Sequence, residues 1–234
     1  MKPFLYLDNW AQPQPTTRFD TALRESGLEV LRLRTNAGEV PAGVDFCGAY
    51  VSPSFNAAYD DESWIHEERV VLRRLADARV PMIGLCFGSQ ILASALCGRD
   101  QVVLRRDRER GYGSITLTDA ARREDPLTRG MPATVPVFHW HEDEVRADHL
   151  DMQVLGFSAD CANQIWRWRR GPVWGVQPHP EFDRRQVIDW FTANRAEFEA
   201  GGLDFEELAR RADDNVIAAR LIGNFLSYVT AAAV

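Results

Sequence analysis

A cysteine between two glycines follows one of the most apolar segments of the chain. Residues 82–85 are apolar, Cys86 comes next, and Gly84 and Gly88 lie two positions on either side of it. This spacing is that of the nucleophile elbow G-x-S-x-G, with cysteine in place of serine. The nucleophile of such a strand-to-helix turn has a strained backbone, and side chains at the two glycine positions would collide. The spacing therefore predicts a cysteine nucleophile, although a buried core cysteine is the simpler alternative.

The predicted turn also supplies an electrostatic environment for the sulfur. A helix beginning just after Cys86 would direct its free N–H groups and partial positive charge at the thiol, which favours the thiolate. The N–H of Phe87 would be placed to donate to an oxyanion.

A histidine and a glutamate follow another apolar segment, far downstream. Residues 173–176 lead into Gln177, and His179 and Glu181 come after it, separated by Pro180. In an extended chain residues i and i+2 point to the same side, and Pro180 keeps His179 out of the helical region. Glu181 is thus predicted to orient the imidazole of His179, which would take the thiol proton. Each residue alone would be assigned to a strand end or a solvated loop, but a cysteine elbow makes the catalytic interpretation the stronger one.

Three motifs together resemble those of the class I glutamine amidotransferases. Residues 84–90 read GLCFGSQ, residues 177–181 read QPHPE, and residues 140–143 read WHED. The resemblance covers most of the chain in the family's order and is greatest to free-standing, single-domain members, which include γ-glutamyl peptidases. It implies that Gln90 holds the α-amino-acid end of the substrate and that the WHED segment, with His141 and Asp143, lies beside the substrate.

Two positions depart from the family pattern. The family usually has a Gly-Gly-Pro loop that supplies a second oxyanion donor, whereas residues 51–56 read VSPSFN. Pro53 has no N–H to donate, so the donor is expected to be Ser52, Ser54 or a neighbour. Glu142 stands where the family often has glycine.

The order of apolar segments predicts an α/β fold. Short apolar strands are expected within residues 4–7, 28–33, 44–51 and 82–85, with helices between them, which is typical of a parallel sheet. Further strands within 102–104, 114–117, 135–138, 152–157 and 164–168 suggest an antiparallel portion. The resemblance implies a flavodoxin-like architecture of this kind. We expect one domain over residues 1–234, with a helical tail from about 184 to 234.

The segment between two of the later strands is highly charged. Residues 105–110 read RRDRER and predict a solvated hairpin or bend, with a patch for acidic substrates as the alternative.

Two histidines alternate along another predicted strand, which raises the question of a metal site. His139 and His141 would share one face of a regular strand, and carboxylates follow them. No third ligand is evident at typical zinc spacing, so the sequence predicts no metal and no cofactor. One of the two histidines is expected to be functional and the other to be its packed neighbour, but the sequence does not distinguish them.

The composition excludes several classes of protein. The 234 residues carry a formal net charge of −7, which argues against a nucleic-acid binder. No apolar run approaches the roughly 20 residues of a membrane span. The four cysteines form no C-x-x-C pair, and no signal peptide is evident, so we expect a cytoplasmic protein with reduced thiols.

The resemblance implies hydrolysis of a γ-glutamyl amide, most simply of glutamine, through a thioester on Cys86. Ammonia from glutamine would pass to a separate synthetase or acceptor subunit, because the chain contains no synthetase domain. The first alternative is a stand-alone γ-glutamyl peptidase or hydrolase that acts on glutathione-like or γ-glutamyl-amine compounds. The second is a regulatory subunit that keeps the fold without the chemistry.

Overall fold

A nine-stranded mixed sheet forms the centre of the molecule, in the order β2-β1-β3-β4-β9-β8-β7-β5-β6. The structure is a computed structural model that describes residues 2–12, 14–200 and 202–232. The predicted α/β fold with an antiparallel portion is confirmed. Five strands at one side of the sheet run parallel, and the remaining strands extend it by antiparallel pairing.

The parallel strands are short and, apart from the edge strand, buried. They are β1 (Phe4–Asp8), β2 (Val30–Arg34), β3 (Gly48–Val51), β4 (Met82–Leu85) and β9 (Val173–Val176). Strand β9 pairs in parallel with β4, although it lies about ninety residues later in the chain. This pairing places the segments after Leu85 and after Val176 side by side at the carboxyl ends of adjacent strands, where sites of open α/β sheets gather.

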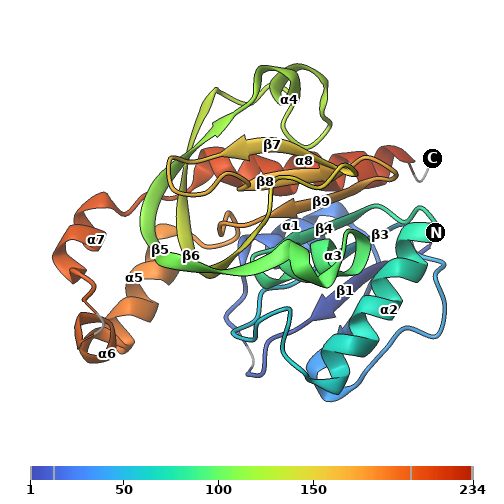
Figure 1. The fold of residues 1–234 in the computed structure, drawn as a ribbon, viewed down its shortest axis with the longest axis horizontal. Coiled ribbons are helices and arrows are strands. Elements are labelled where there is room, and N and C mark those ends of the chain that lie inside the picture. Colours follow the sequence, from blue (N-terminus) through green and yellow to red (C-terminus); the bar gives the residue numbers. More distant parts are fainter. Residues whose placement is uncertain (1, 13, 201, 233–234) are drawn as a thin grey trace.

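The antiparallel half contains two long, curved strands, β5 and β6, that extend beyond the parallel half, and two shorter ones (Figure 1). These strands are β5 (Val102–Leu117), β6 (Thr134–Val145), β7 (Met152–Phe157) and β8 (Ile165–Trp168).

Helices cover both faces of the parallel strands because consecutive strand residues point to opposite faces. Phe4 and Tyr6 belong to a core shared with α1 (Arg18–Ser26) and α8 (Val216–Ala232), whereas Leu5 and Leu7 belong to a second core. That second core is shared with α2 (Ser63–Asp77) and α3 (Phe87–Leu96).

Three helices form a separate cluster beside the long strands β5 and β6 (Figure 1). They are α5 (Arg184–Ala193), α6 (Arg195–Ala200) and α7 (Phe205–Arg211). Their apolar side chains pack on Tyr112 and Phe138, so this part of the helical tail covers the antiparallel extension, while α8 covers the parallel sheet.

Two local features differ from expectation. Residues 105–110 lie within the strand β5 and do not form a hairpin; the expected solvated bend takes the form of an irregular register between Leu104 and Glu109, where residues 106–108 are exposed. Arg105 pairs with Glu144 and Arg110 with Glu142 of β6. The helix α4 (Asp119–Glu124) was not expected.

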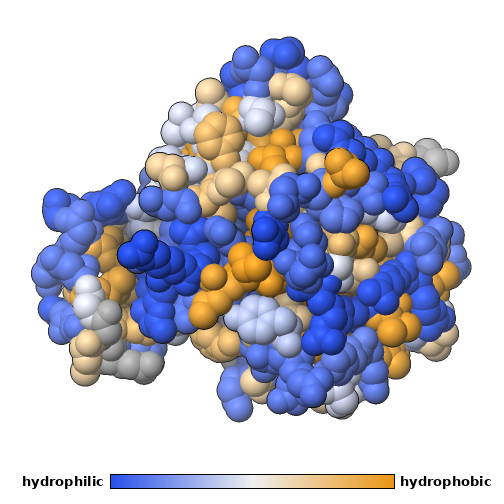
Figure 2. All heavy atoms as spheres, viewed as in Figure 1, coloured by the Kyte–Doolittle hydropathy of each residue, from blue (hydrophilic) through white to orange (hydrophobic). Residues whose placement is uncertain are grey.

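The surface seen in Figure 2 is mainly hydrophilic, with a group of hydrophobic residues near the middle of the face. Among the described residues no helix combines the length and the apolar character needed to cross a membrane.

A buried acid in α2 should make the stability of the fold depend on pH. Glu68 is almost completely buried, neither of its carboxylate oxygens accepts a hydrogen bond among the described residues, and burial raises its pKa to about 8. The folded state therefore holds a proton that the unfolded chain releases near its ordinary pKa of 4.5. The free energy of unfolding should fall as pH rises between these values, by at most about 1.4 kcal/mol per pH unit.

We predict that Glu68→Gln removes this fall and unfolds at a higher temperature than wild type at pH 8, with a smaller difference at pH 5. Thermal unfolding followed by circular dichroism at pH 5 and pH 8 measures the unfolding temperatures of both proteins. Glu67→Gln, at the exposed neighbouring position, is the matched control and should follow wild type at both pH values. Equal pH dependence of wild type and Glu68→Gln would contradict the prediction.

Candidate active site

The turn at Cys86 has the strained geometry that the glycine spacing predicts. Cys86 has φ +51° and ψ −111°, in a region that residues with a side chain rarely adopt, and it joins β4 directly to the first turn of α3. Its side chain is largely buried, with 8% of the residue exposed. The backbone is held on both sides, because the Cys86 N–H donates to Val176 O of β9 at 2.8 Å and Gln90 N–H donates to Cys86 O at 3.1 Å.

The two glycines are required by contact with neighbouring backbone. A Cβ at Gly88 would lie 2.1 Å from the carbonyl oxygen of Val51, and one at Gly84 would lie 2.3 Å from the backbone of Gly88. The elbow is therefore pressed against the end of β3, which brings the 51–56 loop beside Cys86.

The segment after β9 brings His179 and Glu181 together. His179 Nδ1 lies 2.7 Å from Glu181 Oε1, and both side chains are buried. The backbone N–H of His179 donates to Phe138 O of β6 at 2.9 Å, and its ring stacks on Phe182 with centroids 5.3 Å apart. These contacts fix the position and the tilt of the imidazole.

The carbonyl oxygen of Trp140 in β6 lies between the cysteine and the histidine. It is 3.7 Å from Cys86 Sγ and 3.3 Å from His179 Nε2. The sulfur and the imidazole thus approach one point from the ends of two adjacent strands.

The charges in this cluster favour an imidazolium. Burial by itself lowers the pKa of His179, but the negative charges of Glu181 and Cys86, with hydrogen bonds to both, outweigh burial and raise that pKa well above its ordinary value. A His179 that holds its proton beside Cys86 is the partner that a thiolate needs.

The predicted oxyanion donors differ in their availability. Phe87 is the first residue of α3, and the first N–H groups of a helix have no acceptor within it. The N–H of Ser52 already donates to Leu7 O at 3.0 Å, and Ser52 Oγ accepts from Asn9 N–H at 2.8 Å, so Ser52 is a structural residue. Ser54 instead lines the pocket in front of Cys86.

This pocket opens between the 54–60 loop, α3 and β6. Cys86, Gln90, Tyr59 and Asp143 line it together with Ser54. Tyr59 donates its hydroxyl to Asp143 Oδ1 at 2.9 Å, and burial raises the pKa of Asp143 above its ordinary value. The pocket therefore combines a thiol with a carboxylate and an amide.

His141 lies at the pocket, as the motif implies, but its ring points into the protein. Its ring is fully buried, with Nδ1 2.9 Å from Asp143 O and Nε2 3.0 Å from Glu109 Oε2. Both ring nitrogens thus face groups of the protein. Tyr59 and Trp140, through its carbonyl, are site residues that sequence analysis did not single out; the motif contained Trp140, but only the strand pairing shows where its carbonyl points.

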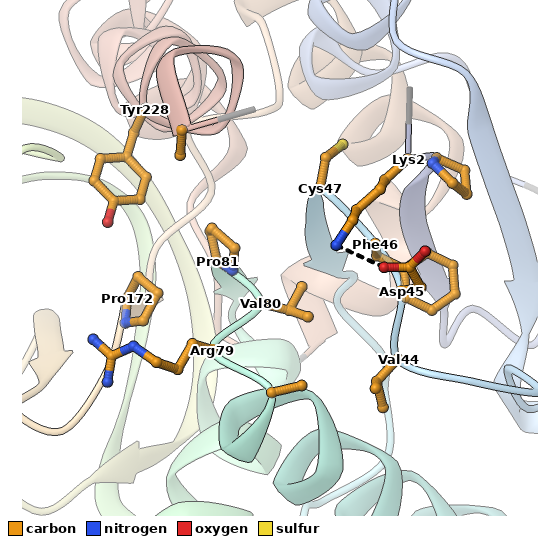
Figure 3. A pocket seen from close by; sticks show the side chains of 13 residues that line it. Lys2, Val44, Asp45, Phe46, Cys47, Arg79, Val80, Pro81, Pro172 and Tyr228 are labelled. Carbon is orange, nitrogen blue, oxygen red and sulfur yellow. Dashed lines mark ion pairs between the residues drawn. The ribbon is translucent and has the colours of Figure 1, made fainter. Parts of the chain in front are cut away.

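A second cavity lies at the opposite, amino ends of the strands (Figure 3). Lys2 and Asp45 form a largely exposed ion pair there at 2.6 Å, and burial raises the pKa of the Cys47 thiol. This cavity places no activated nucleophile beside a base, in contrast to the pocket at Cys86.

Comparison with known proteins identifies the family. Residues 12–190, well over half of the chain, match the family model described as glutamine amidotransferase class-I. The chain belongs to this family.

The curated relatives include peptidases and components of a synthase. Gamma-glutamyl peptidase 4 of Arabidopsis thaliana is 26% identical, over 73% of this chain and 69% of the relative. One component of the glutamine-hydrolyzing GMP synthase of Methanococcus maripaludis is 29% identical, over 56% of this chain and 65% of that component. The match to the synthase component thus covers just under two thirds of that protein.

Solved structures of the class I fold superpose over nearly the whole chain. A glutamine amidotransferase from Thermotoga maritima gives a TM-score of 0.81 at 20% identity, covering 98% of both chains. A glutamine amidotransferase from Methylobacillus flagellatus gives 0.82 at 20% identity, covering 99% of this chain and 95% of the other. At these identities the likeness establishes the fold alone.

The contact between the elbow and β3 gives a direct mutational test. Gly88→Ala forces a methyl group into the Val51 carbonyl, and we expect it to lower the free energy of unfolding by at least about 3 kcal/mol. Chemical denaturation measures the loss.

The matched control is Gly223→Ala in α8, where a Cβ meets nothing within 4 Å. It should raise stability by about 0.5–1 kcal/mol, because alanine is the better helix former. A Gly88→Ala protein as stable as Gly223→Ala would show that the elbow is not packed as described.

Proposed function

We propose that this protein hydrolyses a γ-glutamyl amide by covalent catalysis, with Cys86 as nucleophile, His179 as acid and base, and Glu181 as the residue that orients His179. The observation that carries the proposal is the convergence at the Trp140 carbonyl. Cys86 Sγ and His179 Nε2 lie 3.7 and 3.3 Å from it, and Glu181 holds the other ring nitrogen at 2.7 Å.

In the first half-reaction the Cys86 thiolate attacks the γ-carbonyl carbon and forms a C–S bond. The N–H of Phe87 and a backbone donor of the Ser54 loop stabilise the oxyanion; the loss of one such donor typically costs about 10²–10³ in rate. When the C–N bond breaks, His179 gives its proton to the leaving nitrogen, and ammonia or an amine departs.

In the second half-reaction water attacks the γ-glutamyl thioester. His179 takes a proton from the water, the C–S bond breaks, and glutamate leaves while Cys86 returns to the thiolate. The same imidazole thus serves as acid and then as base.

The pocket supports recognition of the amino-acid end of the substrate. The Asp143 carboxylate, held by Tyr59, offers a counter-charge to an α-ammonium group, and Gln90 lies on the same wall with Nε2 3.4 Å from Asp143 O. Because both ring nitrogens of His141 face the protein, we assign His141 to supporting this wall and not to touching substrate.

Glutamine is the substrate that we place first, and its ammonia would pass to a separate synthetase. The second candidate is a γ-glutamyl peptide. It is favoured by the longer match to the Arabidopsis peptidase and by two exposed apolar side chains, Phe55 and Leu104, which line the pocket and suit a larger leaving group. Glutamate release by the purified chain from glutamine, glutathione and γ-glutamyl dipeptides decides between them.

Replacing the nucleophile tests the chemistry. We expect Cys86→Ala to lose glutamate release by about 10⁴-fold or more on every substrate, because the covalent route is removed. Cys97→Ala is the matched control and should retain activity, since burial raises the pKa of the Cys97 thiol to about 12. Residual activity of Cys86→Ala near that of wild type would end the proposal. A wild-type chain without turnover but with a reactive Cys86 would indicate an enzyme that needs its partner; an inert thiol would indicate the regulatory role.

Replacing the predicted counter-charge tests substrate recognition. Asp143→Asn should reduce kcat/KM by about 10–100-fold, mainly through KM, because it removes a charged hydrogen bond to the substrate. Asp189→Asn, on the exposed surface of α5, is the control of equal charge change and should leave both constants unchanged. A loss confined to kcat would contradict a binding role for Asp143.

A further inference from the structure

Two buried histidines and a partly buried glutamate meet between β5 and β6, behind the wall of the pocket. Glu109 of β5 lies opposite His141 of β6 in the strand register, and His139 lies two residues before His141 on the same face. His141 Nε2 is 3.0 Å from Glu109 Oε2, and His139 Nδ1 is 3.4 Å from Glu109 Oε1. One ligand atom from each residue lies within 4.8 Å of the other two.

The two imidazoles are enclosed and poorly satisfied. The exposed fraction of the side chain is 1% for His139 and 0% for His141. Neither nitrogen of His139, nor Nε2 of His141, has a well-formed hydrogen bond among the described residues. Burial of such polar atoms is costly, so the arrangement calls for a group that all three could bind.

Close packing and outer contacts hold these side chains in place. Gly113 lies beside the ring of His139, and a Cβ there would come within 3.1 Å of it. Glu109 accepts hydrogen bonds from Gln164 Nε2 at 2.8 Å and from Ser158 Oγ at 3.3 Å. Such outer donors orient carboxylates that ligate metals.

We propose that Glu109, His139 and His141 bind a divalent transition-metal ion of the zinc class. Two histidines and one carboxylate are a ligand set that zinc accepts, with water in the fourth position. Ligand atoms about 2.1 Å from a tetrahedral ion lie roughly 3.4 Å apart. The two histidine nitrogens lie 3.0 and 3.4 Å from different oxygens of Glu109, and one ligand atom of each residue lies within 4.8 Å of the other two, so a bound ion would draw them to this spacing.

The ion would act on structure and not on the reacting atoms. It links β5 to β6 just beyond the irregular register between Leu104 and Glu109, and its two histidine ligands flank Trp140, whose carbonyl meets Cys86 and His179. The metal therefore holds the strand that completes the active site.

Metal binding is best measured in the Cys86→Ala protein, which removes the catalytic thiol as a competing ligand. Titration calorimetry with Zn²⁺ should show one tight equivalent, and Glu109→Gln or His139→Gln in this background should weaken it by about 100-fold or more. His66→Gln, which removes a more exposed histidine, is the control and should leave the affinity unchanged.

Two further readouts separate this site from others and from misfolding. Zn²⁺ at about 100 times its Kd should raise the melting temperature of the Cys86→Ala protein by roughly 5–10 °C. Co²⁺ should give visible d–d bands without sulfur-to-cobalt charge transfer. The proposal is overturned if the Cys86→Ala protein binds no Zn²⁺, if folded His139→Gln binds it equally well, or if charge-transfer bands place the metal on a cysteine.

Discussion

The close contact between Gly88 and the Val51 carbonyl is the constraint on which the site depends. It lets the turn at Cys86 press against the end of β3, so that the strained cysteine, the start of α3 and the 51–56 loop share one edge of the sheet. Main-chain bonds then lock the turn from both sides, through Val176 of β9 and Gln90 of α3. Backbone strain of this kind persists only where the surrounding structure determines it fully. The apolar cores on both faces of the parallel strands supply that support.

The antiparallel extension of the sheet forms the wall of the active-site pocket that faces the Cys86 turn. Strand β6 delivers the carbonyl of Trp140 to Cys86 and His179 and carries Asp143 to the pocket, while its Phe138 carbonyl fixes the His179 backbone. The aromatic cluster of α5 to α7 packs on the outside of the same strand. The site therefore joins two halves of the sheet, and the position of β6 matters as much as that of the elbow.

Sequence analysis found the parts that local chemistry determines. The glycine spacing predicted the turn at Cys86, and the His-Pro-Glu spacing predicted contact between His179 and Glu181, because both depend on backbone conformation within a few residues. It did not find Glu109 beside His139 and His141, because that contact depends on the register of β5 against β6. It did not find the ion pairs of Arg105 and Arg110, because their acidic partners lie more than thirty residues away. It kept Ser52 as an oxyanion donor because only the fold shows that its N–H is already bound to Leu7.

The central claim is that Cys86 is a nucleophile that His179 activates and that reacts with a bound γ-glutamyl group. Intact-mass spectrometry, after incubation with a glutamine analogue that carries an electrophilic ketone in place of the γ-amide, tests it most directly. The account predicts one adduct per chain, located on Cys86, slowed by excess γ-glutamyl substrate and strongly reduced in His179→Asn. Adducts spread over Cys47, Cys97 and Cys161, or a Cys86 adduct whose rate is unchanged in His179→Asn, would contradict it.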